Sequence, residues 1–125
     1  MLSKTNLLAQ CEQLDEYWSP RIVGEVNDQY VKVAKLLGSF VWHKHDNEDE
    51  LFYILQGTLV IEYQDQSVEL TTGDMHIVPR GVLHNPRAEQ ECLIALVEKK
   101  STQHTGDIVT AKTRSVDHQL GLNSQ

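Results

Sequence analysis

The stretch HKHDNEDELFYILQG, residues 43–57, decides which fold and which chemistry the chain can support. It opens with two histidines one residue apart, passes through four acidic residues and ends in an apolar run. On a strand, side chains two residues apart project from the same face, so His43 and His45 can reach one metal ion together. Glu50 begins the apolar run and shares the face of its inward residues, so it is the acid expected to point toward such an ion. A charged hairpin loop with two exposed histidines is the alternative interpretation.

The other three acids of this stretch, Asp46, Glu48 and Asp49, are expected in a solvated loop. Asp49 has a further option, because carboxylates beside metal sites often accept a hydrogen bond from a metal-binding histidine. We therefore expect only Glu50 among the four acids to contact the ion directly.

On both sides of this stretch, between residues 21 and 100, the hydrophobic pattern has a period near two. Apolar runs alternate with turn residues such as Asn27-Asp28 and Gly73. The runs are RIVGEVN, YVKVAKLLG, FVWHKH, ELFYILQG, TLVIEYQ, SVELTTG, DMHIVPRG and ECLIALVEKK. Many short strands at this spacing indicate an all-β fold, an antiparallel double sheet arranged as a sandwich or barrel.

Two of these runs carry apolar residues on both faces. In FVWHKH, Val41 lies on the face of the two histidines, while Phe40 and Trp42 lie on the opposite face. A sheet with one face in water would be polar at alternate positions, so something covers the second face. Either the N-terminal helix or a second subunit does so, and we favour a homodimer.

The two ends of the chain flank the predicted barrel of residues 20–100. Residues 1–19 are expected to form a helical segment that starts at Ser3 as N-cap. Its apolar stripe consists of Leu7, Leu8, Cys11 and Leu14. Residues 101–125 are polar and weakly patterned, which predicts an extended arm with a loose end.

Composition and length exclude several classes of function. The 125 residues correspond to one domain, and the formal net charge of −7 disfavours a nucleic-acid partner, because phosphate binding needs a basic face. The N-terminal stretch contains neither the apolar run of a secretory signal nor that of a membrane span, so we expect a cytoplasmic protein without membrane association. Cys11 and Cys92 follow no metal-binding spacing and are expected to be reduced, partly buried thiols.

Two motifs of the chain resemble those of the cupin family. The first reads His43-Lys44-His45, four residues, Glu50, six residues, Gly57, and the second reads Gly73, five residues, Pro79-Arg80-Gly81, two residues, His84. Fifteen residues separate Gly57 from Gly73, and the match covers residues 38–85. Two positions depart from the family pattern. Gly38 stands four residues before His43 rather than five, and Ala88 occupies a position where the family often has asparagine.

The resemblance implies a cupin jelly-roll barrel with one divalent metal ion inside it, held by His43, His45, Glu50 and His84. Nitrogen and oxygen ligands without thiolate suit iron, manganese, nickel, copper or zinc, and the sequence does not choose among them. Two adjacent positions would stay open on a six-coordinate ion, which favours an oxygen-rich small molecule as substrate.

Three functions agree with such a site. A redox metal would support dioxygenase-like oxidation, which is the function we favour. A non-redox ion would support isomerase or lyase chemistry on a sugar or sugar acid. A ligand-binding cupin without catalysis is the third alternative.

His76 and Tyr63 are the candidate catalytic residues beside the metal. His76 can act as an acid or base that titrates near neutral pH, unless it is merely exposed or hydrogen-bonded within the sheet. Tyr63 shares the face of the inward residues of its strand, so it is either a core residue or a hydroxyl in the pocket.

Other side chains are expected to have lesser roles. Arg80 and Arg87 flank His84 and can orient an anionic substrate, although surface arginines are common. The remaining candidates are expected outside the pocket, as packing or interface residues (Trp18, Trp42) or as solvated side chains of the arm (His104, His118).

Overall fold

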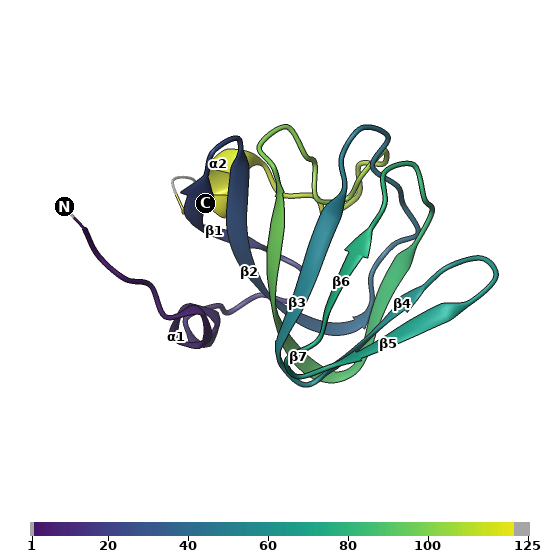
Figure 1. The fold of residues 1–125 in the computed structure, drawn as a ribbon, viewed down its shortest axis with the longest axis horizontal. Coiled ribbons are helices and arrows are strands. Elements are labelled where there is room, and N and C mark those ends of the chain that lie inside the picture. Colours follow the sequence, from purple (N-terminus) through teal and green to yellow (C-terminus); the bar gives the residue numbers. More distant parts are fainter. Residues whose placement is uncertain (1, 122–125) are drawn as a thin grey trace.

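Strand β7 (Asn85–Lys99) organises the sheet, because three other strands pair with it. In the computed structural model, which describes residues 2–121, it is accompanied by six shorter strands and two helices (Figure 1). These elements are α1 (Leu7–Glu12), β1 (Arg21–Val26), β2 (Gln29–Ser39), β3 (Glu50–Gln56), β4 (Thr58–Glu62), β5 (Ser67–Thr71), β6 (Met75–Val78) and α2 (Val116–Gln119).

The strands are antiparallel and follow the order β1-β2-β7-β3-β6, while β4 pairs with both β5 and β7. The C-terminal part of β7 lies between β2 and β3, whereas residues 85–87 pair with β4. One long strand therefore joins the two layers, and the β4–β5 hairpin diverges from β3 and β6 in Figure 1. The predicted all-β jelly-roll barrel with a short N-terminal helix is confirmed.

Inward-facing side chains of alternating strand positions fill the barrel. Phe52 and Ile54 of β3 and Leu59 and Ile61 of β4 are buried in one apolar cluster, as the period of two predicts. Burying each such side chain stabilises the fold by about 1.5–3 kcal/mol before conformational entropy is subtracted. The same cluster reaches the polar groups of the barrel, because Phe52 lines a cavity together with Glu50.

The motif glycine Gly57 joins β3 to β4 where the chain passes close to β7. Its φ is +105°, and a Cβ atom there would lie 3.1 Å from the carbonyl oxygen of Glu91 and 3.2 Å from the Cα of Cys92. Both the backbone conformation and the close approach therefore require glycine.

Helix α1 covers part of the outer face of the sheet. Cys11 and Leu14 pack with Val33 of β2 and Leu93 of β7 in a second apolar cluster. The N-cap is Asn6, whose Oδ1 accepts a hydrogen bond of 2.9 Å from the backbone N–H of Ala9. The prediction of Ser3 was wrong, because asparagine caps a helix as well as serine does and only the last turns of the segment contact the barrel.

The two cysteines are free and completely buried, more so than expected. Burial raises the pKa of both Cys11 and Cys92 to about 11, which keeps them as inert thiols at neutral pH.

The run FVWHKH, predicted as a strand, forms only one isolated bridge, between His43 and His84. Pro86 lies opposite this run and accepts a hydrogen bond from the backbone N–H of Phe40, but it has no N–H to return. The ladder is interrupted there, and the side chains of this run therefore do not alternate between the two faces as expected. Phe40 packs against the core although Trp42, predicted on the same face, is exposed.

The C-terminal segment, residues 101–121, crosses the upper end of the barrel and returns to α2 beside β1 (yellow in Figure 1). These residues form turns and α2 where an extended arm was expected, and Thr102, Thr105 and Gln119 are buried. Residues 122–125, predicted as its loose end, lie outside the described residues. The proposed division at residues 19/20 and 100/101 stays a prediction.

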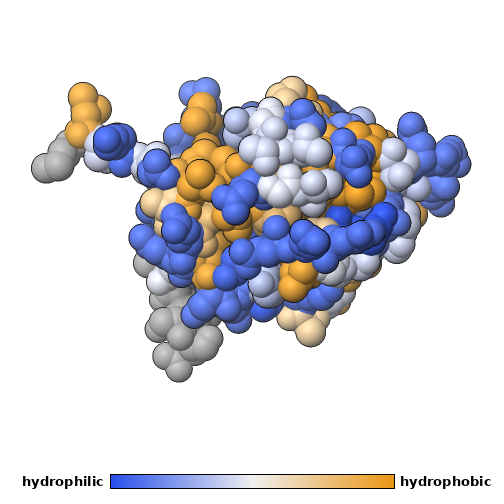
Figure 2. Space-filling model, turned by 90° about the horizontal axis from the view of Figure 1, so that it is seen from below, coloured by the Kyte–Doolittle hydropathy of each residue, from blue (hydrophilic) through white to orange (hydrophobic). Residues whose placement is uncertain are grey.

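The surface of the molecule is mixed in polarity. Seen from below, apolar atoms reach the surface on either side of a band of hydrophilic side chains (Figure 2). Within residues 2–121, no helix has both the length and the apolar character to cross a membrane.

Candidate metal centre

The two motifs meet where the segment before β3 lies against the segment before β7. His43 and His84 exchange two backbone hydrogen bonds of 2.9 Å, and the backbone N–H of Gly81 donates to the His45 carbonyl at 2.7 Å. Glu50 is the first residue of β3 and points into the barrel. The four side chains are buried, and one ligand atom from each lies within 4.8 Å of those of the others.

Backbone carbonyls orient two of the imidazole rings. His43 Nδ1 donates to the Val41 carbonyl at 2.8 Å, and His84 Nδ1 donates to the Val82 carbonyl at 2.9 Å. Because a carbonyl only accepts, the proton of each neutral ring sits on Nδ1 and the lone pair sits on Nε2. Such a bond fixes the tautomer and the orientation of metal-binding histidines.

The atoms at the centre of the cluster have no hydrogen-bond partners among the described residues. These atoms are His45 Nε2, His84 Nε2 and Glu50 Oε1. The two nitrogens lie 3.3 and 3.7 Å from the Glu50 oxygen. Buried polar atoms are rarely left unpaired unless an ion or water completes them. Three imidazoles and one carboxylate are donors that a divalent transition metal accepts, so the cluster could hold such an ion.

The charges of the cluster are strongly coupled. Burial acts to raise the pKa of Glu50, but His45 and His84 outweigh it and hold that pKa well below its usual range. Burial also acts to lower the pKa of His45, but the adjacent Glu50 carboxylate outweighs this effect and raises it. Burial and the neighbouring His84 lower the pKa of His43 to about 4. In the metal-free cluster, Glu50 is therefore ionised, and its carboxylate favours the protonated form of the adjacent His45.

A buried contact between Lys32 and Glu98 adjoins the cluster and was not expected from the sequence. Lys32 Nζ lies 2.6 Å from Glu98 Oε1, and both side chains are almost completely buried. Glu98 stands opposite Glu50 in the β3–β7 ladder. Burial and the Glu50 charge raise the pKa of Glu98 to about 8, against the influence of Lys32. The two carboxyls thus share one proton near neutral pH, and Glu98 holds it.

The signal for this pair is present in the strand pattern. Lys32 has the same phase as the inward residues Ala34 and Leu36 of β2, and Glu98 has the phase of Leu96 in β7. Charged residues at such inward positions indicate partners inside the barrel.

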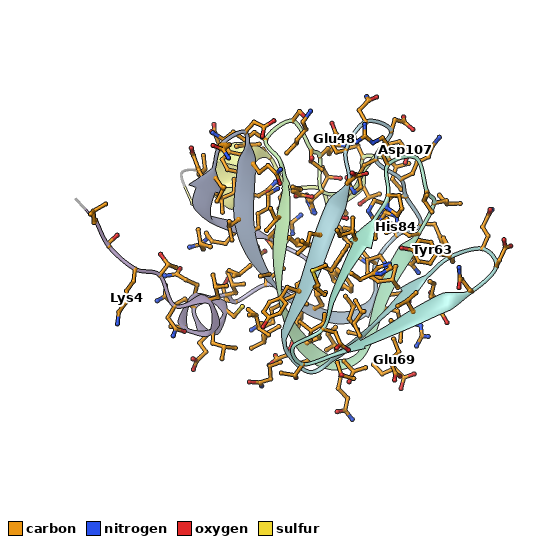
Figure 3. The ribbon with its side chains drawn as sticks, viewed as in Figure 1. Lys4, Glu48, Tyr63, Glu69, His84 and Asp107 are labelled. Carbon is orange, nitrogen blue, oxygen red and sulfur yellow. The ribbon has the colours of Figure 1, made fainter. Side chains whose placement is uncertain are left out.

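Tyr63 and His76 form a second polar pair beside the cluster. The Tyr63 hydroxyl lies 2.7 Å from His76 Nε2, and the Tyr63 ring centroid lies 6.4 Å from that of His84 (Figure 3). Burial and His84 lower the pKa of His76, whereas burial and Glu50 raise that of Tyr63. The hydroxyl therefore keeps its proton near neutral pH and donates a hydrogen bond to Nε2 of the neutral imidazole. Both residues line an open cleft of about 740 Å³.

The other predicted residues lie outside this cluster. Asp49 accepts a 2.9 Å hydrogen bond from the backbone N–H of Arg80 rather than from a histidine. Arg80 is exposed beside Asp49, and Arg87 pairs with Glu62 and Glu89, so both arginines are already engaged with acids.

The tail histidines differ from the prediction of solvated side chains. His104 is buried and lines a cavity with His43 and Glu50, because the C-terminal segment folds over the barrel. His118 is only partly exposed and lies 3.2 Å from Ser19 Oγ. Of the two tryptophans, Trp18 is buried in the core cluster, as a packing residue should be, and Trp42 is exposed.

Comparisons with known proteins agree with this fold. A family model described as "Cupin domain" matches residues 30–98. The uncharacterized protein YdbB of Bacillus subtilis (strain 168) is 33% identical over 104 residues, which cover 82% of this chain and 92% of YdbB.

Two crystal structures are similar over most of the chain. A cupin-2 domain containing protein from Shewanella frigidimarina is 40% identical with a TM-score of 0.75, covering 77% of this chain and 94% of that one. Protein NMB1881 from Neisseria meningitidis is 30% identical with a TM-score of 0.72, covering 78% of this chain and 100% of that one.

The raised pKa of His45 predicts how metal affinity depends on pH. In metal-free protein His45 carries a proton below its raised pKa, and this proton must leave before the nitrogen can bind a cation. The affinity for Co²⁺ should therefore fall by about tenfold per pH unit below that pKa and level off above it. Calorimetric titration in two buffers of different ionisation enthalpy should show release of about one proton at low pH. A pH-independent affinity without proton release would contradict the assignment.

Proposed function

The chain belongs to the cupin family, and we propose that it is a metal-dependent enzyme acting on an oxygen-rich small molecule. One divalent ion, of iron, manganese, nickel, copper or zinc, is held by His43, His45, Glu50 and His84. The convergence of four buried donors, with three central atoms lacking hydrogen-bond partners among residues 2–121, is the observation that supports this proposal. Water would hydrate such atoms at a surface, whereas here a cation accounts for them.

The favoured reaction is a dioxygenase-like oxidation. Three neutral imidazoles and one carboxylate leave a divalent ion with a net positive charge, which attracts a substrate through its oxygen atoms. When bound, the ion supplies either redox chemistry or Lewis acidity, according to the metal. The protein holds the donors, keeps Glu50 ionised through its neighbours and shields the centre from bulk water.

One observation supports a second candidate, a non-redox isomerase or lyase acting on a sugar or sugar acid. The Tyr63–His76 pair offers a hydroxyl proton and a neutral imidazole beside the cluster, which are the groups that proton transfer requires. His76 can accept the proton through Tyr63 and return it later. Both residues would then be catalytic.

Metal binding is tested with two matched variants. Glu50→Gln removes the carboxylate charge with little change of shape and should weaken metal affinity by at least about a hundredfold. Asp49→Asn makes the same change one residue away, at a side chain bonded to Arg80, and should leave the affinity nearly unchanged. Elemental analysis of anaerobically purified protein should find about one equivalent of metal in the parent chain and in Asp49→Asn.

Two results would count against the metal site. One is loss of metal from Asp49→Asn with retention in Glu50→Gln. The other is the absence of bound metal from the parent chain after each candidate ion has been added, which would leave a non-catalytic cupin as the better description.

The role of His76 is tested separately from metal binding. His76→Phe should keep the metal content, because the ring lies outside the cluster, but it should lower the rate of a proton-transfer reaction by about a hundredfold. Isomerisation of sugar acids and oxygen consumption are measured side by side with the metal-loaded protein. Turnover that consumes oxygen at the same rate in the parent protein and in His76→Phe would support the oxidative reaction. It would also show that His76 has a structural and not a catalytic role.

A homodimer is proposed through the outer face of β3 and β6, where Tyr53, Met75 and Ile77 are exposed and α1 does not lie. Sedimentation equilibrium should give twice the chain mass for the parent protein. Ile77→Lys should shift it to the monomer mass, whereas Val109→Lys, at an exposed apolar residue of the C-terminal segment, should not. A monomeric parent chain would contradict the dimer. The cytoplasmic location also stays a prediction.

A further inference from the structure

A second, smaller cavity adjoins the cluster, and neither Tyr63 nor His76 lines it. Its volume is about 30 Å³, and its ionisable lining residues, among those that the structure describes, are His43, Glu50 and His104. The other lining residues are apolar and include Trp18, Phe40 and Phe52. A water-sized probe needs roughly 10–15 Å³, so a small group fits, and the apolar walls favour a group without hydrogen bonds of its own.

The C-terminal segment closes this cavity and is held firmly in place. The backbone N–H of Asp107 donates to the Lys44 carbonyl at 2.9 Å, and Asp107 Oδ1 accepts from the Lys44 N–H at 3.2 Å. Figure 3 shows Asp107 beside Glu48, at the loop that follows the two histidines. Gly106 has a φ of +69°, and a Cβ there would lie 2.7 Å from Cδ2 of His43. The segment thus packs directly on a residue of the cluster.

The His104 ring is fixed in plane and in tautomer. It stacks on Phe40 at 5.9 Å, and Phe40 stacks on Trp18 at 4.7 Å. The backbone N–H of Arg114 donates to His104 Nε2 at 2.7 Å, so the proton of the ring sits on Nδ1. Burial lowers the pKa of His104 to about 3, and the ring is neutral at physiological pH. No hydrogen bond to Nδ1 occurs within residues 2–121.

His104 therefore offers one free N–H donor next to two residues of the cluster. Nδ1 is not one of the fully enclosed polar atoms without a partner, so it keeps an accessible face from which it can donate to an acceptor that enters the cavity. His43 and Glu50 line the same cavity, but no hydrogen bond joins either of them to Nδ1 among the described residues, whereas an oxygen atom of a bound small molecule could accept one.

We propose that His104 is a substrate-binding residue, which donates from Nδ1–H to an acceptor oxygen of the small molecule held at the cluster, while the adjacent cavity receives a methyl-sized apolar group of that molecule. The substrate class is accordingly a short oxygen-rich acid or ketone with a small alkyl substituent. This inference rests on the proposed function, since the metal ion would hold the remaining oxygens.

Two variants of His104 separate the donor from the packing. His104→Phe keeps an aromatic ring against Phe40 but has no N–H. His104→Asn is smaller but places an amide N–H near the position of Nδ1. Both lose the acceptor for the Arg114 N–H, so loosening of the segment is common to both and only the donor differs.

Lactate and glycolate serve as probes, because they differ by one methyl group. In full-length protein loaded with Co²⁺, lactate should bind about fourfold more tightly than glycolate, as expected for one buried methyl. His104→Phe should weaken lactate binding by about tenfold, whereas His104→Asn should stay within about threefold of the parent protein. Equal lactate affinity in the parent protein and in His104→Phe would overturn the proposal.

A readout that needs no metal distinguishes this proposal from the metal site itself. The ¹H–¹⁵N signal of the buried His104 Nδ1–H in metal-free protein should shift on addition of lactate and saturate. If the parent chain takes up no Co²⁺, the proposed function fails and this signal alone decides the role of His104. An unshifted signal, or a parent protein that binds neither acid with or without cobalt, would overturn the inference.

Discussion

Burial of the Glu50 carboxylate is the constraint on which the upper half of the barrel depends. An ionised carboxylate removed from water costs several kcal/mol unless opposite charge or hydrogen-bond donors replace its hydration. Two imidazoles approach it from one side, and Glu98 with its bound proton adjoins it from the other. Lys32 Nζ in turn contacts Glu98 Oε1 at 2.6 Å. The β3–β7 register that places Glu50 opposite Glu98 is therefore an electrostatic requirement as well as a packing result.

The same constraint explains why the cluster suits a cation. The imidazoles satisfy the carboxylate only in part, since the Nε2 atoms of His45 and His84 lie 3.3 and 3.7 Å from Oε1 without forming a well-aligned hydrogen bond. A cation at the centre would pair with all four donors and replace the proton that His45 otherwise carries. The apolar cluster of the barrel contributes stability that offsets the cost of burying these polar and charged groups.

Both ends of the chain contribute to the surroundings of this site. Trp18 reaches the cavity from the N-terminal segment, and His104 reaches it from the C-terminal segment. Trp18, Phe40 and His104 stack in series, and the Phe40 ring lies edge-on to His43, so both ends of the chain build the wall beside His43. The cleft at Tyr63 and His76 remains open on the other side, so the two sides of the cluster differ in polarity and access.

Much of the fold and of the metal centre could be predicted from the sequence, and each prediction that was wrong has a physical explanation. The spacing of His43, His45 and Glu50 follows from strand periodicity, whereas His84 could be added only through the resemblance to cupins. The prediction of a strand at FVWHKH was wrong because Pro86, some forty residues away in the sequence, lies opposite this run and lacks the N–H that would continue the ladder. The local sequence does not show that a proline will lie there. The prediction that His104 is solvated was wrong for a similar reason, since a polar C-terminal sequence does not indicate that the segment folds over the barrel.

The central claim is that the three histidines and Glu50 bind one ion inside the barrel, and X-ray absorption spectroscopy of the metal-loaded protein tests it most directly. The account predicts a first shell of nitrogen and oxygen atoms near 2.0–2.2 Å, with the outer-shell scattering typical of several imidazole rings. A shell containing sulfur near 2.3 Å, or one without imidazole scattering, would contradict it and place the ion elsewhere in the chain.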